Sequence, residues 1–339
     1  MRKLLAYFLI GALAAGCSPP EEGDDVTCEG DKCDGATGEG WSSSTKHIVP
    51  KQVYEYLQKY QWGDYHLVFH MSRRFFIAGD NTRRWLESLS EKYADLQEGD
   101  PGSGIEFLAM HRAMIEHLRE KFGDVALPES IQDGDGFKTM GEVLDGWNTD
   151  EKMIAQIQAH GGNVEAFRTA AAKLRDTASF ASEDEFGLFL QTSLRLSRMV
   201  DETNTEKRFY DRDSTSGAGI HNSLHGTFAE AGSPIDVGDP GKNLGNVMFW
   251  GIHGYIEAAW KNYEAHHTRT SAEQAAFSHQ LERFRLHMQL HSDFHEQHQT
   301  EIPRAPAPLR DEIKSNGKAF RNGADCADLD PSTTMPDCT

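Results

Sequence analysis

Two sets of histidines at helical spacing constrain the fold of this chain of 339 residues more than any other feature. Each set opens with two histidines four residues apart and closes with a single histidine in an apolar segment. The members are His66, His70 and His111 in the first set, and His221, His225 and His253 in the second. Histidines four residues apart on a helix share one face, with Cβ atoms about 6 Å apart. The spacing therefore predicts helices that direct pairs of imidazoles toward one metal ion.

The neighbours of the two single histidines predict that both rings point into a core. Their helical faces are apolar, with Phe107, Leu108, Met114, Ile115 and Leu118 around His111, and Phe249, Trp250, Ile256 and Trp260 around His253. A buried imidazole needs a hydrogen-bond partner or a metal. A hydrogen bond explains one such histidine more simply, but two of them, each following a histidine pair, favour metal binding. Three imidazoles without a nearby cysteine or carboxylate are typical of copper or zinc sites, not of calcium or magnesium sites.

Several other histidines are predicted to have structural roles. His117 lies six residues after His111, about 240° round the helix, so we expect it at the surface and outside the site. A late helix carries His287, His291, His295 and His298 at a spacing that would suit a metal, but we favour packing with hydrogen-bonded rings. Four more are expected in loops or at a solvated helix end: His47, His160, His266 and His267.

Apolar residues recur at helical spacing through most of residues 46–310, and the alternation typical of strands is scarce. This pattern predicts helices over residues 62–77 and 105–122, and further helices within residues 137–200. The segment from Ser103 to Glu106 predicts a capping box at the start of the helix that carries His111. The expected fold is therefore a mostly α domain over residues 46–310.

The beginning of the chain predicts export. Met1-Arg2-Lys3, the apolar run to Leu13 and Ala14-Ala15-Gly16-Cys17 predict a signal peptide over residues 1–16. Gly16-Cys17 after small residues resembles a bacterial lipoprotein cleavage box, which implies a lipid on Cys17 and attachment to the cell envelope, at the outer membrane. The alternative is ordinary signal cleavage and secretion. Residues 17–45 are rich in Ser, Pro, Gly and acidic residues and predict a flexible tether, and residues 311–339 predict a polar tail.

The other four cysteines form two local pairs near the chain ends. Exported proteins favour disulfides, so we predict bridges between Cys28 and Cys33 and between Cys326 and Cys338. The central stretch of about 290 residues has no cysteine and must fold by packing. The formal net charge of −19 argues against nucleic acid as a partner, because phosphate contacts need clustered Lys and Arg.

The segments around the histidines resemble a known family. Phe107-Leu108-Ala109-Met110-His111-Arg112-Ala113 resembles the first-copper signature of the type 3 dicopper proteins (tyrosinases, catechol oxidases and haemocyanins), with Met110 in place of the usual Trp. His221-Asn222-x-x-His225 resembles the start of the second-copper motif. Asp239-Pro240-Gly241 and the run from Phe249 to Trp260 resemble its end, with Glu257 where many members carry Asp. The resemblance covers residues 60–125 and 205–262.

The resemblance implies an antiparallel four-helix bundle that holds two copper ions, with three histidines each, and binds O2 between them. It also implies Asn222 as a catalytic residue that assists proton removal from a phenol, although a role in capping or turning the chain is equally open. Tyrosinases usually take one first-copper histidine from the loop before the His111 segment, and the loop at residues 100–103 has none. The pair His66 and His70 resembles instead the arrangement in arthropod haemocyanins and phenoloxidases. A protein with one copper ion, or with a non-canonical pair of copper ions, therefore stays open.

The function expected from the resemblance is a copper-dependent oxidoreductase that converts o-diphenols, with monophenols as a further class, to o-quinones with O2. The alternative is a non-enzymatic surface lipoprotein that binds copper or O2, as haemocyanins do. A hydrolytic zinc site is disfavoured, because neither histidine pair contains an internal Glu to act as general base. A di-iron carboxylate bundle needs two Glu-x-x-His motifs, and only the segment from Glu264 to His267 fits.

Overall fold

Helices dominate the computed structural model, which confirms the mostly α prediction. It describes residues 47–75, 78, 80–89, 96–128, 136–192, 195–200, 206–211 and 219–298, all within the compact unit Ser44–Thr339. The helices are α1 (Lys51–Lys59), α2 (Trp62–Arg73), α3 (Asp80–Ser88), α4 (Ser103–Phe122), α6 (Met140–Asp145), α7 (Asp150–Ala159), α8 (Val164–Arg175), α9 (Glu183–Gln191), α10 (Ile220–Thr227), α11 (Val247–His266) and α12 (Ser271–His298). The signal peptide, the tether, the tail, Cys17 and both predicted disulfides lie outside the described residues.

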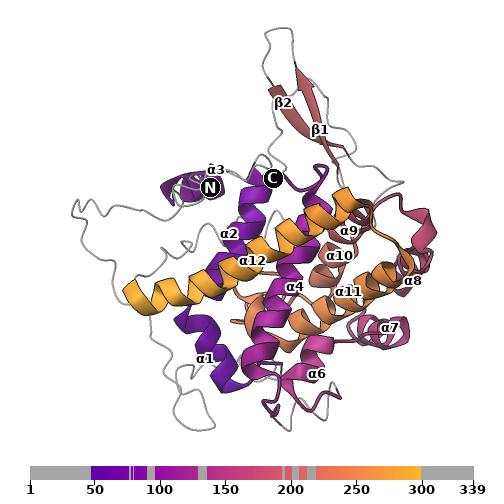
Figure 1. Ribbon diagram of the computed structural model, residues 1–339. Coiled ribbons are helices and arrows are strands. Elements are labelled where there is room, and N and C mark those ends of the chain that lie inside the picture. The colour runs from indigo at the N-terminus through magenta and orange to yellow at the C-terminus, as the bar shows by residue number, and fades with distance from the viewer. Residues whose placement is uncertain are drawn as a thin grey trace. The chain divides into compact units, whose positions relative to one another are not determined.

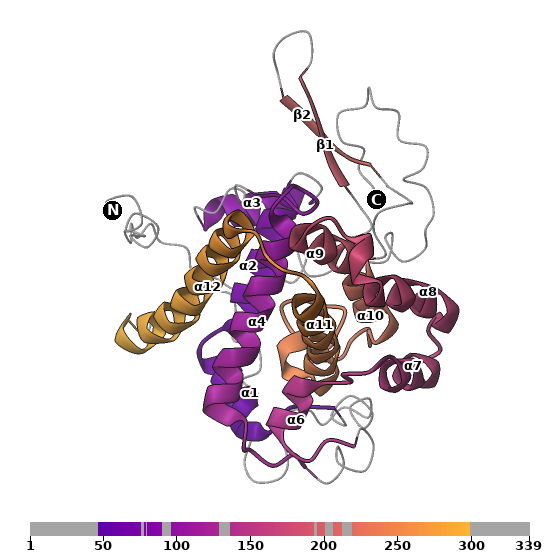
Figure 2. The same cartoon turned by 45° about the vertical axis from the view of Figure 1, so that its right-hand side comes forward.

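Helices α4 and α11, of 20 residues each, form the centre of this arrangement. Helix α12 lies across α4 (Figure 1), whereas α11 contacts α4, α8 and α10 (Figure 2). Glycines let the helices approach closely. A Cβ on Gly187 of α9 would lie 2.3 Å from the carbonyl oxygen of Gly104 in α4. Both helices bury their apolar faces in one continuous core, in which Phe107, Phe249, Trp250 and Trp260 are almost fully enclosed.

The start of α4 differs from the predicted capping box. Its N-cap is Gly102, with φ of 96°, and no side chain of the N-cap accepts a hydrogen bond. Asp184 of α9 accepts instead from the backbone N–H groups of Gly102, at 2.7 Å, and Ile105, at 3.1 Å. Glu106 does not reach back to the N-cap, because it pairs with Arg73 and Arg283. A residue about 80 positions along the chain therefore caps this helix, which local sequence does not reveal.

Residues 195–200 were predicted as helix, and that prediction is wrong. They form strand β1 (Arg195–Val200), which pairs in antiparallel register with β2 (Glu206–Asp211), Arg195 opposite Asp211. The segment RLSRMV has no strict alternation, so the pairing rather than the local pattern identifies the strand. Helix α2 ends at Arg73, which is earlier than the predicted end at residue 77.

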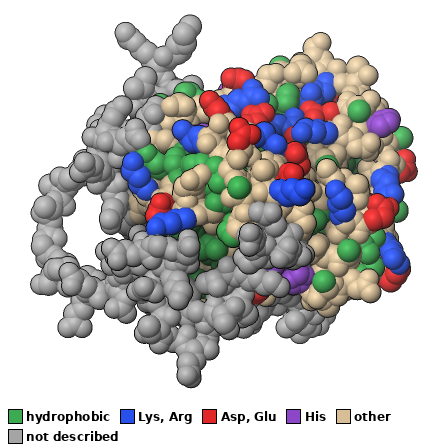
Figure 3. Space-filling model, turned by 90° about the horizontal axis from the view of Figure 1, so that it is seen from below, with side chains coloured by type: hydrophobic (Ala, Val, Ile, Leu, Met, Phe, Trp, Pro, Cys, Tyr) green, Lys and Arg blue, Asp and Glu red, His purple; other side chains and the backbone are tan. Residues whose placement is uncertain are grey.

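The described surface carries charges of both signs. On the face shown in Figure 3, Lys and Arg side chains alternate with Asp and Glu side chains instead of gathering by sign. Many are paired, such as Arg285 with Glu116 and Arg119 with Asp145. Among the described residues, no helix is both long and apolar enough to cross a membrane.

Candidate metal centre

Four helices bring the predicted ligand histidines into one cluster. Helix α2 carries His66 and His70, α4 carries His111, α10 carries His221 and His225, and α11 carries His253. The closest ring centroids are 4.4–4.5 Å apart, for the pairs His66–His70, His111–His253 and His221–His225. His70 and His221, from different predicted sets, lie 5.7 Å apart with nearly parallel rings. The two sets therefore meet in a single buried centre.

The structure groups these histidines differently from the two predicted sets. Within the described residues, two groups of three have ligand nitrogens all within 4.8 Å of one another: His66, His70 and His111, and His111, His221 and His253. The first group is the predicted first set. The second group contains His111, whereas the predicted member His225 belongs to neither group. Both groups consist only of histidine, with no carboxylate or thiol.

Hydrogen bonds determine which nitrogen of each ring is free to bind a metal. Nδ1 donates to a backbone carbonyl in four rings: His66 to Pro240 (2.9 Å), His111 to Phe107 (2.9 Å), His225 to Val237 (2.7 Å) and His253 to Phe249 (2.8 Å). Carbonyls only accept, so the proton of each neutral ring is on Nδ1 and Nε2 keeps a lone pair. Nε2 is buried without a partner in four rings: His111, His221, His225 and His253. Such atoms are rare in native proteins and here are the nitrogens that a metal would use.

His66 and His70 form the other edge of the cluster. Their Nε2 atoms lie 3.0 Å apart. Since metal–nitrogen bonds are about 2.0–2.1 Å long, this separation lets both nitrogens bind one ion. The residues present therefore fit a metal in both halves of the cluster.

The turn between α10 and α11 orients a histidine of each predicted set. Val237 and Pro240, three residues apart, accept from His225 and His66 respectively. Gly63 lets this turn pack closely against α2, because a Cβ at that position would lie only 2.3 Å from the carbonyl oxygen of Gly241. Asp239 fixes the turn by accepting from the backbone N–H of Gly241 at 3.0 Å. The sequence signals a turn at Asp239-Pro240-Gly241, but not the direction of its carbonyls, so these two acceptors were missed.

Burial keeps the histidines neutral. Desolvation lowers the pKa of His66 to about 3 and the pKa of His225 to about 4. Desolvation also lowers the pKa well below the usual 6.5 for the other four: His70, His111, His221 and His253. All six rings are therefore neutral near pH 7, which is the form that binds metals.

Phenylalanine rings enclose the cluster. Phe249 lies 4.0 Å from His253 and 5.2 Å from His66 between ring centroids, and Phe107 lies 4.5 Å from His111 and 4.8 Å from His221. Each phenylalanine thus contacts both predicted sets. His66 and His253 are each 1% exposed. The histidines therefore lie among apolar side chains, and His225 is the half-buried member.

Asn222 has a defined contact in the centre. Its side-chain oxygen accepts from Nδ1 of His221 at 3.1 Å. Asn222 therefore orients His221 as the backbone carbonyls orient four of the other rings. The N-cap of α10 is Gly219, so Asn222 does not cap that helix. Its predicted catalytic role stays a prediction.

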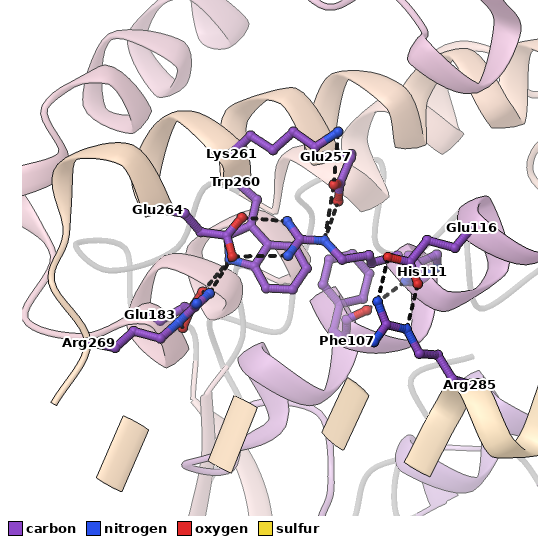
Figure 4. A network of polar contacts seen from close by, with 11 residues as sticks. Phe107, His111, Glu116, Glu183, Glu257, Trp260, Lys261, Glu264, Arg269 and Arg285 are labelled. Carbon is purple, nitrogen blue, oxygen red and sulfur yellow. Dashed lines mark hydrogen bonds and ion pairs between the residues drawn. The ribbon is translucent and has the colours of Figure 1, made fainter. Parts of the chain in front are cut away.

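A charged network between α4 and α11 lies beside His111 of the centre (Figure 4). Arg112 Nε donates to both carboxylate oxygens of Glu257 at 3.0 Å, and its terminal nitrogens donate to Glu264 at 2.7 and 3.0 Å. The guanidinium also covers the Trp260 ring at 3.4 Å from the centroid. Arg269 extends the network to Glu183. These pairs tie α4 to α11, which carry the stacked rings of His111 and His253.

His117 is not the surface residue that helical spacing predicted. It is half-buried, and its Nε2 lies 2.6 Å from the hydroxyl of Tyr56 on α1 and its ring 5.3 Å from that of Trp62. The reason is that α1 and α2 cover this face of α4, which the spacing within one helix cannot show. His117 does stay outside the histidine cluster, as predicted.

The late-helix histidines do not form a described metal group. His291 is buried, and its Nε2 donates to the carbonyl of Tyr60 at 2.6 Å. His287 is half-buried beside Phe284, with ring centroids 5.9 Å apart. Among the described residues, no group that could hold a metal includes either of them. The side chains of His295 and His298 lie outside the described residues. His160 and His266 are exposed, as expected.

The donor set limits which metals suit the centre. Neutral imidazoles are typical ligands of copper and zinc, whereas calcium, magnesium and non-haem iron sites use carboxylates. The carboxylates of Glu257, Glu264 and Glu183 are engaged by Arg112 and Arg269. The centre is therefore a candidate for two nitrogen-bound transition-metal ions. Searches against protein-family models, curated proteins and solved structures find no match to this chain.

Proposed function

We propose that this protein is a copper-dependent oxidoreductase that oxidises o-diphenols, and monophenols as a further class, to o-quinones with O2. The observation that carries the proposal is the convergence of six histidines from four helices on one centre, where the Nε2 atoms on α4, α10 and α11 are buried without a partner. Helices α2, α4, α10 and α11 would be the four-helix core, and six histidines would hold two copper ions. Copper is favoured over hydrolytic zinc because no carboxylate joins the described histidine groups to act as general base.

The chemistry that copper would supply is electron transfer, in which two catechols lose two electrons and two protons each while one O2 becomes two waters. The chain provides the ligands and holds them neutral through burial. Phe107 and Phe249 keep bulk water away from the rings. Because the ligands carry no charge, they would leave the positive charge of bound ions uncompensated. Asn222 and the carbonyls of Val237 and Pro240 hold the rings in place.

Copper reconstitution tests this function. The purified chain, loaded with copper, should consume O2 and turn catechol into its quinone. His253→Ala should abolish both, and His160→Ala, which alters an exposed histidine, should change neither. A chain that holds two coppers but turns over no phenol would contradict the enzymatic proposal.

The burial of the centre favours a second function, the binding of copper or O2 without turnover. His66, His111 and His253 are only 1–3% exposed, and O2 needs much less room than a phenol. In that case O2 should produce a reversible near-ultraviolet absorption band in the copper-loaded chain, and removal of O2 should erase it. Quinone formation from catechol at a steady rate would exclude a purely carrier role.

We propose that the chain is exported and attached to the bacterial cell envelope by a lipid on Cys17. The support is the N-terminal sequence alone, since these residues lie outside the described structure. Cys17→Ser should move the protein from the membrane fraction to the soluble fraction. Equal fractionation of the two proteins would show that Cys17 carries no anchor.

A further inference from the structure

His111 belongs to both histidine groups that could hold a metal. Its ring centroid lies 5.7 Å from that of His66, 5.6 Å from His70, 5.5 Å from His221 and 4.4 Å from His253. It is therefore central in the cluster, between the half supplied by α2 and the half supplied by α10 and α11.

His111 can bind only one ion at a time. Its Nδ1 donates to the carbonyl of Phe107 at 2.9 Å, which leaves Nε2 as the single metal-binding nitrogen. Nε2 of a neutral imidazole has one lone pair in the ring plane, and that lone pair forms one bond to a metal. The two groups of three cannot both be filled in this arrangement, because they compete for the same atom.

His225 is the ligand that could resolve this competition. Its Nδ1 is held by the carbonyl of Val237 at 2.7 Å, and its Nε2 is buried without a partner. Its ring lies 4.4 Å from that of His221 and 5.4 Å from that of His253. His225 therefore stands next to the second group without belonging to it.

We propose that the centre fills in two steps, with His111 as the ligand that changes ions. A single ion binds to His111, His221 and His253. When a second ion enters at His66 and His70, His111 binds that ion, and His225 replaces His111 at the first. This inference rests on the proposed two-metal centre and adds the order in which its ligands are used.

The two-step scheme and two fixed sets of three predict opposite effects of two substitutions. In the two-step scheme, His111→Ala weakens binding of the first ion, and His225→Ala leaves the first ion and weakens the second. With fixed sets, His111→Ala leaves a tight ion on His221, His225 and His253, and His225→Ala weakens that ion. Loss of a ligand should lower affinity at least as much as loss of a group that orients one, which is about 10–100-fold.

A Cu(II) titration of the metal-free full chain, followed by electron paramagnetic resonance and elemental analysis, makes this test. In the wild type, the resonance signal of an isolated Cu(II) ion should grow until one equivalent of Cu(II) has been added. It should then fall between one and two equivalents, because the spins of the two ions couple. His225→Ala should leave the affinity of the first step as in the wild type and abolish the fall of the signal between one and two equivalents. His111→Ala should weaken the first step by at least about 10-fold. His160→Ala is the matched control at an exposed histidine and should behave as wild type.

A second measurement avoids substitutions, in case a variant fails to fold. With one equivalent of Zn(II), the ring-nitrogen resonances of His111, His221 and His253 in the wild type should shift, and that of His225 should not. A shift of His225 without a shift of His111 would overturn the ligand exchange while leaving the two-metal centre intact. If the wild-type chain takes up no Cu(II) or Zn(II), the exchange and the proposed function both fail.

Discussion

His111 and Arg112 are neighbours in α4, and their surroundings are opposite in character. The nitrogens of Arg112 are paired with the carboxylates of Glu257 and Glu264, and its plane is covered by Trp260. His111 has a buried Nε2 with no partner. A charged group is costly to bury unless it is paired, whereas a neutral imidazole can be buried at lower cost. At these two neighbouring positions, the fold thus pairs the buried charge and leaves unpaired a neutral nitrogen that a metal can use.

The largest expected effect comes from removing a histidine of the centre. His253→Ala removes an Nε2 from the centre. The copper-loaded variant should oxidise catechol no faster than the metal-free wild-type protein does. His117→Ala removes a histidine on another face of α4 and should leave the copper content and activity unchanged. Copper analysis and O2 uptake check both variants. Retained activity in His253→Ala with loss in His117→Ala would refute the assignment of the centre.

Arg112→Ala removes the ion pairs of Arg112 and should lower the free energy of unfolding. Glu257 and Glu264 lose Arg112 but keep Lys261 and Arg269, so the loss should be smaller than the roughly 3–5 kcal/mol of a fully buried ion pair that is broken. Urea denaturation of the metal-free protein measures this loss. Arg112→Lys keeps the charge without the planar double contact and should lose less. Equal stability of Arg112→Ala and the wild type would show that the network is not a structural tie.

Asn222→Ala tests whether the orientation of His221 affects metal binding. The variant keeps every histidine but removes the acceptor for Nδ1 of His221, and loss of such a group typically lowers metal affinity about 10–100-fold. Competition with a chelator measures the affinity. Asn222→Asp keeps an acceptor oxygen and should restore binding, whereas a purely structural role of the amide predicts no such rescue.

The smallest expected effect is on the pH dependence of stability, through His117. Burial lowers the pKa of His117 to about 4, and the nearby Lys121 adds to this. In the unfolded chain the ring takes up a proton below about pH 6.5, so the folded state loses stability as the pH falls from 6.5 to 4. The stability difference between the wild type and His117→Gln should shrink over this range, by at most about 1.4 kcal/mol per pH unit. A constant difference would show that His117 titrates normally.

The ligand helices could be predicted from sequence because their signal is local. Histidines four residues apart, and apolar neighbours at helical spacing around His111 and His253, follow from the geometry of one helix. The mostly α class follows from the same periodicity. All six predicted ligands do meet in one centre in the structure.

The features missed by the sequence depend on contacts between distant segments. Asp184 caps α4 from another helix, and Pro240 orients His66 across 174 residues. His117 is half-buried because other helices cover its face of α4. The central place of His111, within reach of both halves of the cluster, depends on how α4 packs between α2 and α11. No spacing within one helix contains that information.

The number of copper ions that the wild-type chain binds, measured by equilibrium dialysis and elemental analysis, tests the two-metal centre without relying on any enzymatic activity. We expect two ions per chain in the wild type, and fewer than one in a variant with all six histidines of the centre replaced. A wild-type chain that binds no copper, or binding that survives replacement of the six histidines, would contradict the two-metal centre.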